Sequence, residues 1–329
     1  MRLLRPTAAA TAIPLLALGL AACSSSGSGS GSGSTGTATA SATASSASGA
    51  SAAHFPVTLD ASNGKVTLSQ SPSRIVSLSP TATEDLFAVG AGKQVVAVDQ
   101  DSDYPSDAPR TSLDGITPNA EAILKYQPDL VIAYADSNGL VAALQKVGVP
   151  VLIEPAAATL DDAYGQIEQL GEATGHLASA DSTVASMKSE IAAAVKQAGT
   201  DHSQLSYYWE LDPTYYSATS STFIGQIAGL FGLKNIADKV DKAADGGYPQ
   251  LSSEYIVQSS PSIVFLADTV CCGASAKSVA ARPGWSGITA VKVDDVVGLN
   301  DDVASRWGPR LPQLVEQIAA AVEKAPVQQ

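Results

Sequence analysis

Glu121-Ala-Ile-Leu-Lys-Tyr-Gln-Pro128, followed directly by Asp129-Leu-Val-Ile-Ala133, decides the fold because a matching stretch recurs in the second half of the chain. The later copy is Glu254-Tyr-Ile-Val-Gln-Ser-Ser-Pro261, followed by Ser262-Ile-Val-Phe-Leu266. In both copies Glu stands seven residues before Pro, and an apolar run typical of a buried strand follows. Two copies of one helix-then-strand pattern predict two lobes of similar build. The alternative is a chance likeness between two amphipathic segments.

The sequence around the first copy alternates between strand and helix patterns. Apolar strand-like runs occur at 74–78, 95–98, 130–133 and 149–153. Capped or amphipathic helix patterns lie between them, at 83–88, 121–126 and 138–146, each stopped by Gly or Pro. Such alternation favours parallel sheets covered by helices. The fold class is therefore predicted to be α/β, with Rossmann-like lobes.

The middle of the chain contains helix patterns and no strand patterns. Residues 160–198 carry no strand signal, and Gly175 divides them. The second piece, 177–198, places apolar residues such as Val184, Met187 and Ile191 at helical spacing. Its length of roughly 30 Å suits a strut between two lobes. We therefore expect an N-terminal lobe at 55–159, linking helices at 160–200 and a C-terminal lobe at 201–329, which ends in a helix at 311–324.

The first residues are typical of an export signal rather than of folded structure. A short basic start precedes an apolar stretch, and residues 1–22 end in Leu20-Ala21-Ala22 before Cys23. This junction resembles a bacterial lipobox, in which the Cys23 thiol receives a lipid; an ordinary secretory signal is the alternative. Residues 23–54 are mostly Ser, Gly, Ala and Thr and predict a flexible tether. The chain is therefore expected to be extracytoplasmic and lipid-anchored, with no membrane-spanning helix.

Composition excludes several function classes. The formal net charge of -13 disfavours nucleic acid as a partner. Three histidines, at positions 54, 176 and 202, are too few and too scattered for a convergent metal shell, so we expect neither a bound metal nor a cofactor. Cys271 and Cys272 are adjacent, and the sequence allows either a vicinal disulfide or two reduced thiols.

Five groups of residues stand in a fixed order along the chain: Arg74-Ile-Val-Ser-Leu-Ser-Pro80, Thr83-Glu84 with Gly90-Ala-Gly92, Asp103-Tyr-Pro105, Glu121 with Pro128-Asp129, and Gly308-Pro-Arg310. In this order and spacing they resemble the bacterial receptors for vitamin B12, iron-siderophores and haem, a class of periplasmic binding proteins with a helical backbone. The resemblance covers residues from about 74 to 322. It implies a monomeric receptor without enzymatic activity, which carries a siderophore, haem or cobalamin to an ABC permease and its ATPase.

The resemblance also implies roles for single residues. Glu121 and Glu254 match the glutamates, one per lobe, that dock onto permease arginines; acids that favour a helix start are the alternative reading. The positions that match ligand contacts are Tyr134, Tyr215, Tyr248 and Arg306.

The chain departs from the family pattern at several of these positions. Asp101 stands where vitamin B12 receptors place an aromatic residue, and Leu113 replaces a second aromatic. Trp307 and the cysteine pair are particular to this chain. We include Asp101 and Trp307 among the candidate ligand contacts.

Two functions from other classes compete with a receptor. A surface lipoprotein with hydrolytic activity would need an activated nucleophile, yet no Gly-x-Ser-x-Gly elbow and no phosphate-binding glycine loop with Lys occur. A purely structural surface lipoprotein is the other alternative. A receptor differs from both in requiring an aromatic-lined site between the lobes.

Overall fold

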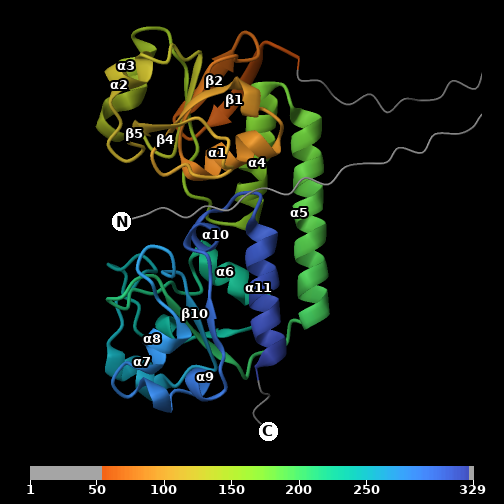
Figure 1. Cartoon of the computed structure of the whole chain (residues 1–329). Helices are drawn as coiled ribbons and strands as arrows, with labels where there is room; N and C mark the ends of the chain where they lie inside the picture. Colours follow the sequence, from red (N-terminus) through yellow and green to blue (C-terminus); the bar gives the residue numbers. More distant parts are fainter. Residues whose placement is uncertain (1–53, 326–329) are drawn as a thin grey trace, which may run out of the picture. The chain divides into compact units, whose positions relative to one another are not determined.

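The computed structural model describes residues 54–325 (Figure 1). The predicted signal segment 1–22, the lipidation site Cys23 and all but the last residue of the tether 23–54 lie outside the described residues, as do residues 326–329.

Strands and helices alternate through both halves of the described chain. The strands are β1 Val57–Ala61, β2 Gly64–Leu68, β3 Ile75–Leu78, β4 Val95–Asp99, β5 Arg110–Leu113, β6 Leu130–Ala133, β7 Val151–Ile153, β8 Ser206–Glu210, β9 Lys234–Asn235, β10 Ile263–Leu266 and β11 Val296–Gly298. The α-helices are α1 Pro80–Ala88, α2 Ala120–Leu124, α3 Leu140–Gln145, α4 Leu160–Thr174, α5 Leu177–Ala198, α6 Phe223–Gly229, α7 Ser253–Ser259, α8 Ala276–Ala280, α9 Thr289–Lys292, α10 Asp301–Ser305 and α11 Leu311–Lys324.

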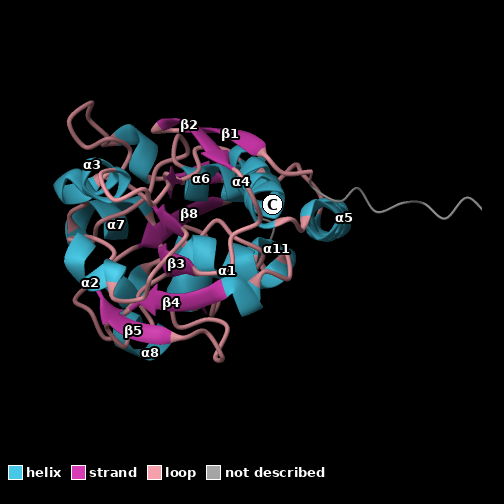
Figure 2. Cartoon of the chain, turned by 90° about the horizontal axis from the view of Figure 1, so that it is seen from above, coloured by secondary structure: helices cyan, strands magenta, loops and turns pink. Residues whose placement is uncertain are grey.

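The N-terminal lobe is built on a parallel sheet. Its strand order is β5-β4-β3-β6-β7, and each neighbouring pair is parallel. Figure 2 shows β3, β4 and β5 side by side. The central strands β3 and β6 are buried along their whole length, as expected for apolar strands covered on both faces. The predicted α/β class is confirmed.

The C-terminal lobe repeats this plan with a second parallel sheet. Its order is β11-β10-β8-β9, and its strand pairs are likewise parallel. The buried run Tyr207, Tyr208 and Trp209 gives β8 its bulk. Tyr207 and Trp209 both lie against Phe265 of β10, with ring centroids 6.0 and 5.2 Å apart. Aromatic residues of this kind are typical of strands in a packed core.

The repeated sequence stretch occupies the same place in both lobes. In the N-terminal lobe α2 leads into β6, which pairs with β3; in the C-terminal lobe α7 leads into β10, which pairs with β8. The residue before each proline has a positive φ, 49° at Gln127 and 42° at Ser260. This left-handed residue ends the short helix and turns the chain into the strand. The likeness is therefore structural and not a coincidence of spacing.

The residue after each proline makes the same backbone contacts. The Asp129 N–H donates to the Arg74 carbonyl at 2.9 Å, and the Ser262 N–H donates to the Ser206 carbonyl at 2.8 Å. In return, each side chain accepts from the backbone N–H of that partner residue, at 2.8 Å for Arg74 and 3.3 Å for Ser206. Both lobes thus align the repeated strand with its neighbour through one local device.

Two helices link the lobes, as the sequence predicts. Gly175, with φ 85°, ends α4, and α5 continues for 22 residues. Val184, Met187 and Ile191 of α5 are buried, which confirms the predicted apolar face. Gly171 of α4 allows this close packing, because a Cβ there would lie 2.3 Å from the Cβ of Ala180.

The long helix predicted between the lobes is α5, and it is packed against a further helix. Helix α11 runs beside α5 (Figure 1), and the Gln197 side chain donates to Glu323 across the pair at 3.1 Å. One apolar cluster continues from the N-terminal lobe through α4, α5 and α11 to the C-terminal lobe. The amphipathic pattern at 311–324 predicts the helix but not the surface that it covers.

The hairpin β1–β2 was not predicted. Its turn residue Asn63 donates to the Val151 carbonyl at 3.0 Å and accepts from the Ile153 N–H at 3.2 Å. The amide side chain therefore continues the hydrogen bonding of the edge strand β7, and the edge is covered. The sequence signals for it are the Asn63-Gly64 dipeptide, typical of a tight turn, and the polar-apolar alternation on either side of that dipeptide within 57–68.

Candidate functional site

The carboxyl ends of the strands in the two lobes face each other. Arg306 follows α10 in the C-terminal lobe, and its guanidinium reaches Glu84, which lies beyond β3 in the N-terminal lobe, at 2.9 Å. At a second place the Gln226 side chain of α6 donates to the carbonyl of Ala158, beyond β7, at 2.7 Å. In open α/β sheets, ligands bind beyond the carboxyl ends of strands. We call these opposed strand ends and the segments that follow them the facing edges.

Glu84 is the centre of an ion-pair network on the facing edges. Its side chain is fully buried and accepts from Arg306 and, through two hydrogen bonds of 2.7 and 2.6 Å, from Arg310. The Arg310 guanidinium also lies 4.3 Å from the ring centre of Tyr104. Buried carboxylates are normally paired in this way, since an isolated charge would be costly.

Arg306 makes further contacts that occupy its donors. One terminal nitrogen also donates to Asp103 at 3.0 Å. The other donates to Asp302 at 2.7 Å and to the Asp101 carbonyl at 3.0 Å. The structure therefore brings the predicted residues Arg306 and Asp101 together. The Asp101 side chain itself is exposed.

Two further carboxyls lie buried next to this network. Asp85 and Glu154 each have one side-chain oxygen without a hydrogen-bond partner. Burial, together with the nearby charges of Glu84 and Glu154, raises the pKa of Asp85 well above its ordinary value. Burial also raises the pKa of Glu154 to about 8. Burial therefore disfavours the charged form of both groups.

Trp307 points to a different place from Arg306. Its indole N–H donates to the Gln166 side chain of α4 at 2.8 Å, and the ring packs against the apolar cluster that joins the lobes. No described contact joins it to the predicted tyrosines. The predicted ligand contact at Trp307 stays a prediction.

Tyr215 belongs to an aromatic group in the C-terminal lobe. Its ring stacks on Trp285 with centroids 5.7 Å apart, and the Arg282 guanidinium lies over both rings, at 5.4 and 4.6 Å. Arg282 also forms two 2.6 Å hydrogen bonds with the buried carboxylate of Glu210, at the end of β8. A bidentate pair of this type fixes the arginine geometrically.

Asp268 lies next to that pair, just beyond β10. It is fully buried, and neither carboxyl oxygen has a hydrogen-bond partner within the described residues. Burial, with the charge of Glu210 nearby, raises the pKa of Asp268 to about 7. A buried carboxyl of this kind at a strand end is a common mark of a functional site.

Tyr134 and Tyr248 complete the predicted tyrosines. Tyr134 directly follows β6 and is half-buried, and Tyr248 is 43% exposed. Both lie beyond strands of their own lobe, as predicted, and no described contact joins either ring to Tyr215.

Sequence reasoning missed Glu210, Arg282 and Tyr104 as site residues. Glu210 had a usable signal, because it ends an otherwise aromatic buried strand. Tyr104 lay inside a motif already quoted. Arg282 carried no such sequence signal, because its partner Glu210 is 72 residues away in the chain.

Glu121 and Glu254 occupy equivalent positions. Each is the second residue of a short helix whose first N–H groups are capped by the preceding side chain, Asn119 in α2 and Ser252 in α7. Both glutamates are exposed. Helices α2 and α7 lie on the side away from α5 (Figure 1). An acid in the first turn also suits the helix dipole.

Cys271 and Cys272 lie in an exposed loop beyond β10, with their sulfur atoms joined as a vicinal disulfide. The loop is held by Asp301 of α10, which accepts from the N–H groups of Val270 and Cys271 at 3.0 and 2.7 Å. The neighbouring residue Asp302 binds Arg306. Helix α10 thus connects the cysteine loop to the network around Glu84.

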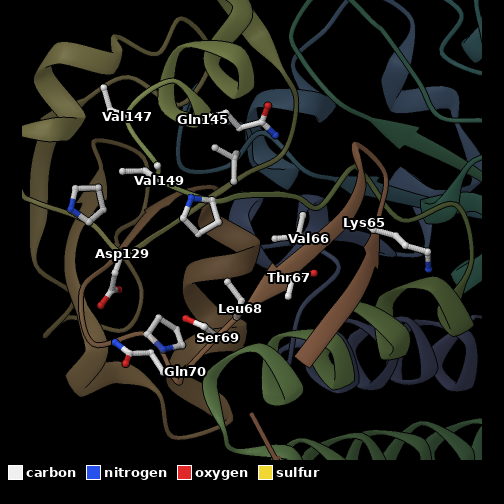
Figure 3. Close-up of a pocket in the computed structure, with 15 residues that line it drawn as sticks. Lys65, Val66, Thr67, Leu68, Ser69, Gln70, Asp129, Gln145, Val147 and Val149 are labelled. Atoms are coloured by element: carbon white, nitrogen blue, oxygen red, sulfur yellow. The ribbon is translucent and has the colours of Figure 1, made fainter. Parts of the chain in front are cut away.

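The cavity in Figure 3 lies elsewhere. It measures about 640 Å³ and is lined by β2, from Lys65 to Leu68, on one side and by residues 145–151 on the other. A second cavity of about 620 Å³ lies between the start of α4 and α6, at the junction of the lobes. Neither contains a predicted ligand contact. The site is therefore assigned from the strand ends and their charged and aromatic side chains.

Two surveys of the described residues complete the description. No helix in 54–325 combines the length and apolar character needed to cross a bilayer. Within the same range, no three His, Cys, Asp or Glu side chains are grouped so as to hold a metal ion.

Comparison with known proteins shows extensive similarity. The family model described as periplasmic binding protein matches residues 75–303. An uncharacterized ABC transporter substrate-binding lipoprotein of Bacillus subtilis is 35% identical over 82% of this chain and 86% of its own length. A cobalamin-binding protein of Halobacterium salinarum is 34% identical over 82% of this chain and 75% of its own length. The crystal structure of a periplasmic vitamin B12-binding protein of Vibrio cholerae superposes with a TM-score of 0.64 at 26% identity, covering 77% of this chain and 97% of that one.

Proposed function

Because the chain belongs to the periplasmic binding protein family, we propose that it captures a metal chelate, with cobalamin the first candidate, for delivery to an ABC permease. Members of this family are transport components without enzymatic activity, so the hydrolytic alternative is set aside. The observation that carries the proposal is the meeting of strand ends from two lobes at Glu84 and Arg306. Haem and ferric siderophores are the competing cargo classes.

The facing edges offer what a large chelate needs. Aromatic rings at Tyr134, Tyr215 and Tyr248 supply flat apolar contacts, and ionised or amide groups around them supply orientation. The cobalamin-binding relative at 34% identity supports a corrinoid as cargo. The lobes share a continuous apolar core and paired linking helices, so little closure is expected on binding.

Permease docking rests on Glu121 and Glu254. The two carboxylates are exposed at equivalent helix starts, one on each lobe. Two separated negative points that meet cationic side chains give a receptor one orientation on its partner and speed encounter. A partner permease and its ATPase then supply the energy for import.

Membrane attachment rests on Cys23 and is part of the proposal. The small residues before Cys23 support lipidation, as does the lipoprotein name of the Bacillus subtilis relative. The tether would keep the binding lobes close to the membrane, where the permease lies. In this proposal the receptor acts as an extracytoplasmic monomer. Its lobe boundaries are proposed at residues 160 and 200.

A thermal-shift screen of the full-length protein tests the cargo. Cyanocobalamin at a hundredfold excess over its dissociation constant stabilises the fold by about 2.7 kcal/mol, which raises the melting temperature measurably. Haemin and ferric trihydroxamates are the comparison ligands. If no chelate in the screen raises the melting temperature, the proposed function is wrong.

Docking has a separate test. We expect Glu121→Ala and Glu254→Ala to leave chelate affinity unchanged and to reduce uptake in cells by at least about tenfold, because each removes one of two charged contacts. Glu172→Ala, on α4 in the linking region, is the matched control and should transport normally. Weakened affinity together with normal uptake would reverse the assignment.

A further inference from the structure

The facing edges carry an unusual charge distribution. In the N-terminal lobe the segments that follow strands are 79–84, 100–109, 114–119, 134–139 and 154–159, and none contains Lys or Arg. The acids in these segments are Glu84, Asp101, Asp103, Asp107, Asp114, Asp136 and Glu154. Glu84 and Glu154 are buried, whereas Asp101, Asp103, Asp107 and Asp136 are exposed. A cargo between the lobes therefore meets mainly acids from this side, with Arg110, which donates to the Gln100 carbonyl, as the nearby cation.

The arginines of the other lobe do not offset this charge. Arg306 contacts three carboxylates, and Arg310 is held by two hydrogen bonds to Glu84. Arg282 is held by two hydrogen bonds to Glu210. Glu84 and Glu210 are both fully buried. An anionic cargo that drew Arg282 away would leave the buried Glu210 unpaired, and one that drew Arg306 away would remove one of the two arginines that pair with Glu84. Both changes are unfavourable for a buried carboxylate.

The remaining cations on these edges are also outnumbered. Lys239 and Lys242 follow β9, in a segment that contains Asp238, Asp241 and Asp245. Beyond β10, Asp268 adds a buried carboxyl whose two oxygens have no partner in the described chain. Asp268 lies beside Glu210 and adds an acid, not a cation, to this edge.

We propose that the cargo is a neutral or cationic chelate, and that chelates bearing free carboxylates or other net negative charge are rejected by the facing edges. The inference rests on the proposed function, since it assumes that a chelate binds there. It separates corrinoids with amide side chains and neutral hydroxamates from haem with its two propionates and from anionic catecholates. The physical cause is repulsion between the negative groups of the cargo and the exposed acids of the facing edges, which salt screens.

Matched ligand pairs test the inference on the full-length protein. The pairs are cyanocobalamin with a derivative that has one side-chain amide hydrolysed to a carboxylate, haemin with its dimethyl ester, and a linear ferric trihydroxamate bearing a free ammonium with its succinylated form. Tryptophan fluorescence titration gives each affinity. Within each pair that binds, we expect the more anionic member to bind at least about tenfold more weakly. This gap, the ratio of the two affinities, should become smaller when the salt concentration is raised from about 0.01 to about 1 M.

The outcomes separate the two proposals. Equal or tighter binding of the anionic members would overturn the charge inference and leave the receptor function standing. If no member of any pair binds, the proposed function fails and the inference fails with it.

A charge variant locates the effect on the facing edges. Asp101→Lys places a cation beside Arg306 on an exposed side chain and should narrow the gap between members of a pair at least about threefold. Asp181→Lys, an equally exposed change on α5, should leave the gap unchanged. If both variants behave alike, the facing edges do not determine the selectivity.

Discussion

The two lobes share the device that positions Glu121 and Glu254 but differ at the edges that face each other. The capped helix, the left-handed residue before proline and the paired strand recur in both. At the strand ends, by contrast, Glu84 of the N-terminal lobe binds arginines that come from the other lobe, whereas Glu210 of the C-terminal lobe binds Arg282 of its own lobe. The helix starts with Glu121 and Glu254 are alike in the two lobes, which suits one partner that contacts both. The facing edges differ between the lobes, which suits one asymmetric cargo placed between them.

The largest expected effects come from the two buried glutamates. Glu84→Ala removes the ion pair of Arg310 and one of the three ion pairs of Arg306, and Glu210→Ala removes the ion pair of Arg282. Each change should lower the free energy of unfolding by about 3–5 kcal/mol. Urea denaturation measures this loss. Asp60→Ala, which breaks the exposed pair with Lys65, is the control and should leave the urea midpoint unchanged.

The comparison of the two lobes becomes sharper if Glu84→Ala and Glu210→Ala lower the free energy of unfolding by different amounts. Arg306 retains Asp103 and Asp302 after Glu84 is removed, whereas Arg282 has no second ion pair within residues 54–325. Glu210→Ala should therefore be at least as destabilising as Glu84→Ala. A Glu84→Ala variant as stable as Asp60→Ala would show that the network between the lobes contributes nothing to the fold.

A smaller effect concerns pH and the buried carboxyl Glu154. Its pKa in the fold is about 8, above its ordinary value, so the folded state keeps a proton that the unfolded chain loses. The stability that this group contributes is complete below about pH 4.5 and is lost progressively as the pH rises toward about 8, by no more than about 1.4 kcal/mol for each pH unit. Glu154→Gln should flatten that decline.

Urea denaturation at a series of pH values from about 5 to about 8 measures the effect, because this range lies between the pKa of Glu154 in the unfolded chain and its pKa in the fold. Part of the slope should persist in the variant, because the pKa of Asp85 is raised as well. An unchanged slope in Glu154→Gln would mean that Glu154 is already ionised in the fold.

The smallest effect is expected at the cysteine pair. A bridge between adjacent residues closes almost no chain, so its reduction should hardly change the free energy of unfolding. Intact mass before and after reduction decides whether the bridge exists, since reduction adds two hydrogen atoms to a bridged chain. An unchanged mass would leave the alternative of two free thiols.

Much of the fold could be predicted from the sequence because the sequence patterns of its strands and helices are local. Apolar strand runs, Gly175 between two helices and the repeated Glu-to-Pro spacing each lie within a short stretch. The α/β class, the linking helices and the last helix were predicted for this reason. The hairpin β1–β2 was not predicted, although its Asn63-Gly64 turn and short strands are local signals. The packing of α11 on α5 was not predicted because it depends on residues far apart in the chain.

The candidate site was readable only in part. Motif positions gave Arg306 and Asp101 as candidate ligand contacts, and in the structure Arg306 donates to the Asp101 carbonyl across the two lobes. They did not reveal that Arg306 is held by Glu84 from 222 residues away, or that Trp307 turns toward α4. Ion pairs of this kind depend on which strand ends the fold brings together, which local sequence patterns do not specify.

A crystal structure of the full-length protein with cyanocobalamin tests the central claim most directly. We expect the corrin ring between the lobes, in contact with residues near Asp101 on one edge and near Tyr215 or Asp268 on the other. Electron density for the ligand in the cavity beside β2, or bound to one lobe alone, would contradict a cargo site formed by the facing edges.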